Sequence, residues 1–211
     1  MISRLHYITQ DIQGKTHWQL AEEACKAGAD WVQLRVKGKD YKEWKYIAQK
    51  TQEICVKYNA MLIINDNVEL AQEILADGVH LGKTDLKPND ARNILGKNFI
   101  IGGTANTFED IMRMQPEEVD YIGLGPFRFT ATKEKLSPVL GIKGYEQIIK
   151  ECRRKSIKIP IIAIGGIEQE DVTELMSTGI HGVAVSSAIN LSDNMGASVK
   201  EFNSLLQTNR V

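Results

Sequence analysis

Hydrophobic and polar residues alternate strictly along residues 31–37, which read Trp31-Val32-Gln33-Leu34-Arg35-Val36-Lys37. Successive side chains of a strand point to opposite faces, so Gln33, Arg35 and Lys37 share one face. The surrounding pattern predicts parallel strands covered by helices, and we therefore expect this polar face to point into the protein interior or its mouth. Two cations there need an anionic partner, because an unpaired buried charge is costly. An edge strand with a solvated face is the alternative.

The rest of the chain repeats an alternation of short apolar stretches and amphipathic segments. Strands are predicted over residues 5–9, 31–37, 61–65, 77–82, 99–103, 120–125, 159–164 and 182–186. Helices are predicted over residues 18–27, 41–58, 68–74, 89–95, 107–114, 145–153, 170–177 and 197–206. Eight such pairs in 211 residues indicate an α/β chain with a single (β/α)8 TIM barrel over residues 1–211, without a linker or second domain. A doubly wound open sheet is the alternative.

Composition and charge narrow the class of protein. The chain is 43% hydrophobic and 25% charged, as expected for a globular domain with a sizeable core. The formal net charge of -1 gives no reason to expect a nucleic acid or a membrane as partner. No apolar run approaches the roughly 20 residues of a membrane span, and the N-terminus lacks a signal-peptide pattern. The three cysteines show no metal-ligand spacing. We expect a cytoplasmic protein with reduced cysteines; a homo-oligomer is left open.

In such a barrel the functional groups lie at the carboxyl ends of the strands. The last two strands end in Gly165-Gly166 and Ser186-Ser187, which supply close-approaching backbone N–H groups and hydroxyls. Phosphate sites in these barrels commonly use the loops after strands seven and eight. A tight turn and a helix cap are the alternative interpretations of these pairs.

Two carboxylates are predicted to face each other at the same mouth. Asp66 and Asp85 follow strands three and four, and no His or Cys ligands accompany them, which suits Mg²⁺. Helix N-caps are the alternative. Arg35, Lys37 and Lys133 would neutralise a diphosphate but repel bare Mg²⁺, so a diphosphate–Mg²⁺ complex accounts for both sets of charges.

The histidines give weaker evidence for a functional role. His80 is interpreted as a packed residue in the middle of a strand, whereas His6, on strand one, could line the mouth. No Ser–His–Asp or Cys–His arrangement is found, so hydrolysis by a nucleophilic side chain has no support. The long loop over residues 126–141 is expected to be functional, because structureless loops of this length are uncommon in compact domains.

An ordered set of short phrases across nearly the whole chain resembles the family of thiamine-phosphate synthases and their thiazole tautomerase relatives. These phrases are Val32-Gln33-Leu34-Arg35-Val36-Lys37, Ile64-Asn65-Asp66, Ala76-Asp77-Gly78-Val79-His80-Leu81-Gly82 with Asp85, Asp120-Tyr121-Ile122-Gly123-Leu124-Gly125-Pro126, Thr130-Ala131-Thr132-Lys133, Ala163-Ile164-Gly165-Gly166-Ile167 and Gly182-Val183-Ala184-Val185-Ser186-Ser187-Ala188-Ile189. Five positions depart from the usual family pattern: His6, Gln10, Lys83, Asn106 and Phe129.

The resemblance implies a Mg²⁺-dependent transferase acting on small phosphorylated substrates. It would move the 4-amino-2-methylpyrimidin-5-ylmethyl group from its diphosphate to 4-methyl-5-(2-phosphoethyl)thiazole, giving thiamine phosphate and diphosphate. By this resemblance Asp66 and Asp85 hold Mg²⁺, while Arg35, Lys37 and Lys133 are catalytic. The pyrimidine diphosphate would be held by Gln33, Arg35, Lys37, Asn65, Thr104 and Lys133, and the thiazole phosphate by Thr130, Thr132, Gly166, Ser186 and Ser187.

Two other functions remain open from the sequence. A thiazole tautomerase would share the fold but needs a group that shuttles protons, and Thr104-Ala105-Asn106-Thr107 contains no histidine. A non-catalytic binder of phosphorylated ligands would not need two carboxylates and Lys133 around a second anion site.

Overall fold

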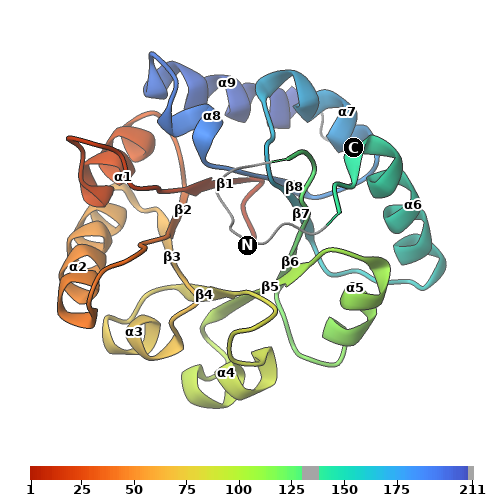
Figure 1. Cartoon of the computed structure of the whole chain (residues 1–211), viewed down its shortest axis with the longest axis horizontal. Coiled ribbons are helices and arrows are strands. Elements are labelled where there is room, and N and C mark those ends of the chain that lie inside the picture. Colours follow the sequence, from red (N-terminus) through yellow and green to blue (C-terminus); the bar gives the residue numbers. More distant parts are fainter. Residues whose placement is uncertain (130–137, 209–211) are drawn as a thin grey trace.

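The computed structural model of this chain shows a closed ring of eight parallel strands with the helices outside it (Figure 1). Residues 1–129 and 138–208 are described. Each strand pairs with its neighbours in chain order, and β8 closes the ring on β1. The strands are β1 (Leu5–Ile8), β2 (Trp31–Leu34), β3 (Met61–Asn65), β4 (Gly78–Leu81), β5 (Ile100–Ala105), β6 (Tyr121–Leu124), β7 (Ile161–Ile164) and β8 (Gly182–Val185). The predicted TIM barrel is confirmed, and the open sheet and the edge strand are wrong.

Helices follow the strands and cover the outside of the barrel. They are α1 (His17–Lys26), α2 (Tyr41–Tyr58), α3 (Val68–Glu73), α4 (Pro88–Leu95), α5 (Phe108–Met114), α6 (Gly141–Arg154), α7 (Val172–Ser177), α8 (Ser187–Asn190) and α9 (Met195–Thr208), with a 3₁₀ turn, η1 (Gln169–Asp171), before α7. Thr16 and Thr107 begin α1 and α5 with reciprocal capping boxes, which satisfy backbone N–H groups that a helix start leaves unpaired. In the described part of the chain, none of these helices has the length and apolar character to cross a bilayer.

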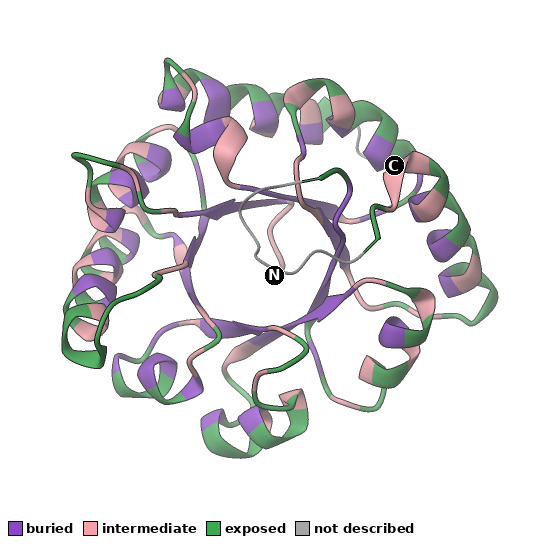
Figure 2. Ribbon diagram, viewed as in Figure 1, coloured by how far each residue is buried: buried purple, intermediate pink, exposed green. Residues whose placement is uncertain are grey.

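The alternation in β2 has the predicted orientation. Val32 and Leu34 pack in the outer core between the sheet and the helices, and Val36 packs against the same core. Trp31 lies in a separate cluster that fills the barrel, and Gln33 is buried on the same face. Figure 2 shows the strands and the inner faces of the helices as the buried layers. One face of β2 therefore packs against the helices, and the other face points into the barrel.

Large rings fill the barrel, and glycine makes room for them. Trp31 stacks on His6 with a centroid separation of 4.2 Å, and the Tyr121 ring meets both at steep angles. Gly102 lies opposite Tyr121 in the register of β5 and β6. A Cβ atom at Gly102 would lie 2.2 Å from the Tyr121 ring, so a side chain there would overlap the ring. His6 is 1% exposed in this interior layer, and it is not among the residues of the mouth, so the expectation that it lines the mouth is wrong.

Several predicted boundaries were wrong. β2 ends at Leu34 rather than at residue 37, because the Arg35 N–H donates to the Thr9 hydroxyl instead of a neighbouring strand. β5 continues to Ala105, since the N–H of Gly125 donates to the carbonyl of that residue. α6 begins at Gly141, four residues earlier than predicted.

Gly102→Ala should lower the free energy of unfolding by about 2–3 kcal/mol, because overpacking a filled interior forces rings out of their rotamers. Gly196→Ala is the matched control, since its Cβ would meet nothing closer than 3.6 Å on α9. Alanine in a helix should leave stability equal or higher there. Urea unfolding of both variants measures the difference, and equal effects would contradict the packing argument.

Candidate active site

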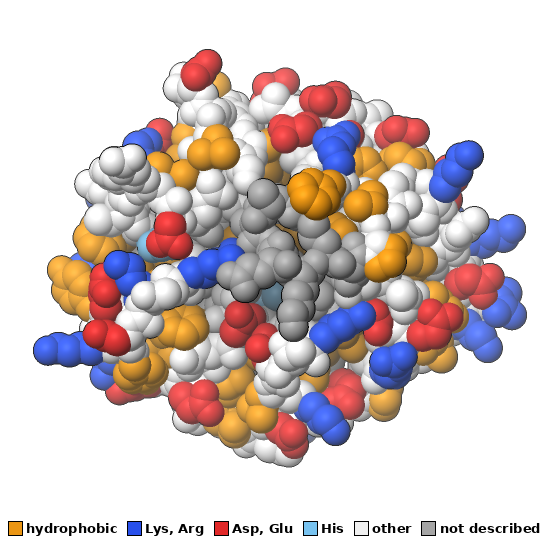
Figure 3. Space-filling view, in the orientation of Figure 1, with side chains coloured by type: hydrophobic (Ala, Val, Ile, Leu, Met, Phe, Trp, Pro, Cys, Tyr) orange, Lys and Arg blue, Asp and Glu red, His pale blue; other side chains and the backbone are white. Residues whose placement is uncertain are grey.

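A cavity of about 890 Å³ opens at the carboxyl ends of the strands. Basic and acidic side chains lie together beside the centre of the face shown in Figure 3. The cavity brings together ten of the predicted site residues: Gln33, Arg35, Lys37, Asn65, Asp66, Asp85, Thr104, Gly166, Ser186 and Ser187. Thr130, Thr132 and Lys133 lie outside the described residues.

The loop after β2 carries the two predicted cations. Gln33 is buried within the strand, whereas Arg35 is partly exposed and Lys37 is exposed beyond its end. The Thr9 hydroxyl accepts the Arg35 N–H at 3.2 Å, and it also contacts His17 Nδ1 at 2.8 Å. His17 in turn contacts Asp11, while burial lowers its pKa. The backbone from which Arg35 projects is therefore fixed by side chains of the β1–α1 segment.

The two carboxylates are placed by loop geometry rather than by helix capping. Asp66 adopts a left-handed backbone with φ of 67°, and its N–H donates to the His80 carbonyl at 2.8 Å. Asp85 Oδ2 accepts the N–H of Gly82 at 2.6 Å, which closes the loop after β4. The residues at the cap positions of α3 and α4 are Asn67 and Lys87, so the N-cap alternative is wrong.

These carboxylates fit a metal that also binds substrate oxygens. Among the described residues there is no group of three or more His, Cys, Asp or Glu side chains able to hold a metal ion. Two carboxylates at one cavity still suit Mg²⁺, which typically joins one or two carboxylates to substrate phosphates and water. The donor set is therefore compatible with Mg²⁺ that also binds substrate phosphate oxygens and water.

The ends of β7 and β8 form the other side of the cavity. Gly165 and Gly166 both have positive φ angles, of 101° and 67°, which glycine adopts without strain because it has no Cβ atom. Ser186 and Ser187 donate their hydroxyls to Gln10 Oε1 at 2.9 and 3.3 Å. Ser186 occupies the cap position of α8, but its side chain makes no capping hydrogen bond. The hydroxyls must turn from Gln10 to donate to an anion.

The buried side-chain amide of Asn190 holds the loop that carries Ser186 and Ser187, called the serine loop below. Asn190 Nδ2 donates to the Ile8 carbonyl at 2.9 Å and to the Ser186 carbonyl at 3.0 Å. Asn190 Oδ1 accepts from the Tyr7 hydroxyl at 2.5 Å, and burial keeps the pKa of Tyr7 well above its usual value. The loop after β8 is thus tied to β1 through a satisfied polar network.

Beneath the mouth, a polar chain crosses the barrel. The Gln33 side chain lies near Tyr121, whose pKa is raised by burial. The Tyr121 hydroxyl lies 3.0 Å from His80 Nδ1, and His80 Nε2 lies 3.0 Å from the Thr104 hydroxyl. Both His80 ring nitrogens therefore have partners inside the barrel. His80 is packed, as predicted, and it also forms part of the cavity floor.

A second network joins the loops after β4, β5 and β6. Lys83 forms an ion pair with Asp110, which also accepts the N–H groups of Asn106 and Thr107. Burial favours a higher pKa for the Asp110 carboxyl, but these donors hold its pKa below the usual value. The Asn106 side-chain amide donates to the Gly125 carbonyl. Lys83 and Asn106, both on the cavity wall, are thereby connected.

Reasoning from the sequence missed the supporting residues Tyr7, Gln10, Asp110 and Asn190 as well as the role of Tyr121. One signal was available: Asn190 follows Ser186 by four residues, which is one helical turn. Gln10 contacts the serines at the end of the neighbouring strand β8, and Tyr121 on β6 contacts His80 on β4. Both contacts join segments far apart in the sequence, so no local spacing predicts them.

Comparison with known proteins places the chain among relatives of one kind. The profile of a family described as thiamine monophosphate synthase matches residues 5–189. A thiamine-phosphate synthase of Flavobacterium johnsoniae is 47% identical over 99% of this chain and 99% of its own length. One from Bacteroides thetaiotaomicron is 42% identical over 94% of this chain and 95% of its own length. The solved structure of a thiamine phosphate pyrophosphorylase from Pyrococcus furiosus superposes with a TM-score of 0.86 at 29% identity, covering 99% of this chain and 97% of that one.

Asn190→Asp should lower the free energy of unfolding by about 3 kcal/mol, because a carboxylate would face the Ile8 and Ser186 carbonyls without a proton to donate. Asn194→Asp is the control: within the described part of the chain, the Asn194 side chain accepts the Ala197 N–H at 2.9 Å and donates no hydrogen bond, and aspartate accepts equally well. Chemical unfolding at neutral pH compares the two. Unchanged stability of Asn190→Asp would show that the network does not hold the loop.

Proposed function

The chain belongs to the thiamine monophosphate synthase family, and we propose that the cavity at the strand ends is where its reaction takes place. The reaction joins 4-amino-2-methylpyrimidin-5-ylmethyl diphosphate to 4-methyl-5-(2-phosphoethyl)thiazole, and the products are thiamine phosphate and diphosphate. The observation that carries this assignment is the similarity over nearly the full length to relatives of that name. The tautomerase alternative is not favoured, since both His80 ring nitrogens already have protein partners and the loop after β5 contains no histidine.

The diphosphate is assigned to the side of the cavity formed by the β2, β3 and β4 loops. Arg35 and Lys37 supply positive charge there, and guanidinium groups bind phosphate oxygens in a forked geometry. Gln33 and Thr104 are buried and Asn65 is partly buried, and these three are suited to hold the pyrimidine ring by hydrogen bonds. Lys133, by family resemblance, adds a further cation.

Asp66 and Asp85 would hold Mg²⁺ against the diphosphate. When bound, the metal would neutralise charge on the leaving group. The hydrogen bond from Gly82 keeps Asp85 in place in the loop, so the carboxylate does not depend on the metal for its position. A diphosphate–Mg²⁺ complex would bring an anion to Arg35 and Lys37 and a cation to Asp66 and Asp85, so it complements both sets of charges in the cavity.

The thiazole phosphate is assigned to the ends of β7 and β8. Gly166 allows close approach of backbone N–H groups, and Ser186 and Ser187 add hydroxyls, as at other barrel phosphate sites. Thr130 and Thr132 are assigned here by family resemblance. The two anionic groups then occupy opposite sides of one cavity, with the reacting carbon and nitrogen between them.

The chemistry suits this set of side chains. The bond between the methylene carbon and the diphosphate oxygen breaks, its electron pair leaves with the diphosphate, and the electron-rich pyrimidine ring stabilises the carbocation. The thiazole nitrogen then donates its lone pair to form the new carbon–nitrogen bond, and no proton is lost. Catalysis therefore depends on stabilising the charge of the leaving group, which Arg35, Lys37 and Lys133 are suited to do.

Incubation of the chain with both substrates and Mg²⁺, followed by chromatographic detection of thiamine phosphate, tests the proposed function. We expect product only when both substrates are present. Absence of product, with the protein folded by circular dichroism, would contradict the assignment.

Asp85→Asn should lower turnover at least about tenfold, because it removes a charge that a hard cation requires. Its side-chain oxygen can still accept the Gly82 N–H, so the thermal midpoint should stay close to that of the unsubstituted chain. Asp90→Asn, at an exposed position in the first turn of α4, is the control. Full activity of Asp85→Asn would remove Asp85 from the metal site.

Arg35→Ala should lower turnover at least about tenfold, because the guanidinium stabilises charge that develops on the diphosphate. The backbone bond from residue 35 to Thr9 is kept by alanine, so the loop should retain its path. Lys39→Ala removes a nearby cation that pairs with Glu43 and is not part of the cavity wall. Steady-state kinetics compare the turnover of the two variants. An equal loss in both would show that turnover depends on the overall positive charge near the cavity and not on Arg35 itself.

A further inference from the structure

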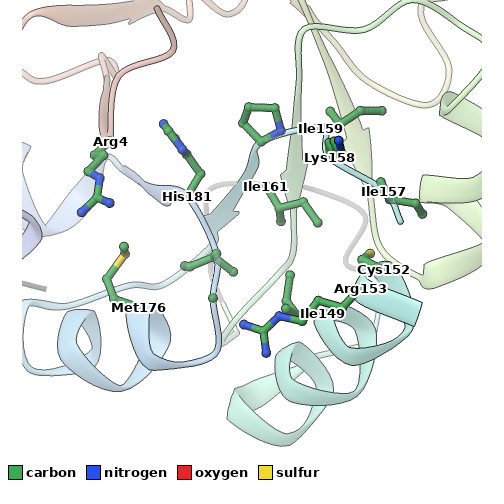
Figure 4. A pocket seen from close by; sticks show the side chains of 13 residues that line it. Arg4, Ile149, Cys152, Arg153, Ile157, Lys158, Ile159, Ile161, Met176 and His181 are labelled. Carbon is green, nitrogen blue, oxygen red and sulfur yellow. The ribbon is translucent and has the colours of Figure 1, made fainter. Parts of the chain in front are cut away.

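A second hollow, of about 380 Å³, lies at the opposite end of the barrel from the proposed active site. It is formed where β1, β7 and β8 begin and where α6 and α7 end. In Figure 4, Arg4 comes from the segment before β1, Arg153 from α6 and His181 from the segment before β8, with Ile149, Ile161 and Met176 among them. The proposed reaction uses none of these residues.

The cations around this hollow have no carboxylate partner within residues 1–129 and 138–208. Arg4 donates one hydrogen bond, to the Leu206 carbonyl at 2.8 Å, and Arg153 donates one, to the Thr178 carbonyl at 3.0 Å. By contrast, four other arginines each pair with a carboxylate: Arg92 with Asp120, Arg113 with Asp110, Arg128 with Asp171 and Arg154 with Glu151. A guanidinium has five N–H donors, so each carbonyl contact leaves most of the donors of Arg4 and Arg153 available.

The walls of the hollow combine this charge with apolar surface. Lys158 adds a third cation, and no Asp or Glu is among the described lining residues. The remaining surface comes mainly from isoleucine side chains together with Met176, Cys152 and Pro160. Gly179 makes room for the Arg153 head group, since a Cβ atom there would lie 1.9 Å from Nη2. Positive charge is concentrated here on a chain whose net charge is -1.

We propose that this hollow is a binding site for a small organic anion, with an oxyanion head group on an apolar body. Arg4, Arg153 and Lys158 lie on different sides of the hollow (Figure 4) and would supply the positive charge that holds the carboxylate or phosphate head, with forked hydrogen bonds possible from the guanidinium groups. The apolar body would lie against Ile149 and Met176. The volume is near the lower end for small-molecule sites, which suits a compound with one ring.

The contacts that Arg4 and Arg153 make with carbonyl oxygens also serve the fold. Leu206 lies in the last turn of α9 and Thr178 is the C-cap of α7, so each guanidinium satisfies a carbonyl at a helix end. This role accounts for one donor of each arginine. It accounts neither for the position of three cations around one hollow nor for the absence of a carboxylate among its described lining residues.

Titration of ¹⁵N-labelled protein with phenyl phosphate, followed by two-dimensional NMR, tests the proposal. Saturable shifts are expected at the backbone amides of Gly179 and His181. Shifts at Gly166 and Ser187 report separately on the proposed active site, so binding there cannot be mistaken for binding here. Benzoate tests a carboxylate head, inorganic phosphate tests the head alone, and benzyl alcohol tests the apolar body alone.

Phenyl phosphate or benzoate should bind at least about tenfold more tightly than benzyl alcohol and inorganic phosphate, because both parts of the site are needed. Lys158→Met and Arg153→Met should each weaken binding about fivefold or more, since a charge-assisted contact is lost. Arg154→Met, next to Arg153 but paired with Glu151 and not lining the hollow, should bind like the unsubstituted chain.

Lys158 is exposed and is in no ion pair found among the described residues, so Lys158→Met tests the site even where Arg153→Met loses stability. The proposal is overturned if the amides of Gly179 and His181 show no saturable shift with either anion. It is equally overturned if Lys158→Met and Arg154→Met bind alike, or if benzyl alcohol binds as tightly as the anions. Catalytic turnover of Lys158→Met should be unchanged, which separates this site from the proposed active site.

Discussion

Closure of the parallel sheet is the constraint on which the rest of this structure depends. Once β8 pairs with β1, the inner face of every strand must be filled by side chains, because no solvent is left to cover it. The chain fills this space with Trp31, Tyr121 and His6, and Gly102 provides the volume for Tyr121. The same closure brings all eight carboxyl ends to one opening, so short loops with few residues each can build a site with many functional groups.

Side chains that fill the barrel interior are in direct contact with side chains that line the proposed active site. Tyr121 belongs to the filled interior, yet its hydroxyl contacts His80, and His80 contacts Thr104 on the cavity floor. Around the rim, Asn190 holds the serine loop and Asp110 joins the β4 and β5 loops through Lys83. Buried polar groups of this kind are stable only when their partners are all in place. The residues that line the cavity are therefore held in position by hydrogen-bond networks that begin inside the barrel.

Much of this could be predicted from sequence where local periodicity decides the outcome. The alternation in residues 31–37 predicted which side of β2 faces the helices, and the repeated strand–helix rhythm predicted the barrel. The polar residues at strand ends were brought to one cavity, as expected from parallel topology. What could not be predicted depends on contacts between distant segments. The end of β2 at Leu34 follows from the Thr9 hydroxyl, 26 positions before Arg35, and the exclusion of His6 from the mouth follows from its stacking on Trp31.

The central claim is that the cations of the β2 loop and the carboxylates Asp66 and Asp85 form one site for a metal–diphosphate complex. Calorimetric titration of the unsubstituted protein with the pyrimidine diphosphate, in Mg²⁺ and again in EDTA, tests this most directly. The account predicts binding at least about tenfold tighter with Mg²⁺, because the carboxylates repel a bare diphosphate. Equal affinity in EDTA would contradict it, since the carboxylates would then have no part in holding the diphosphate.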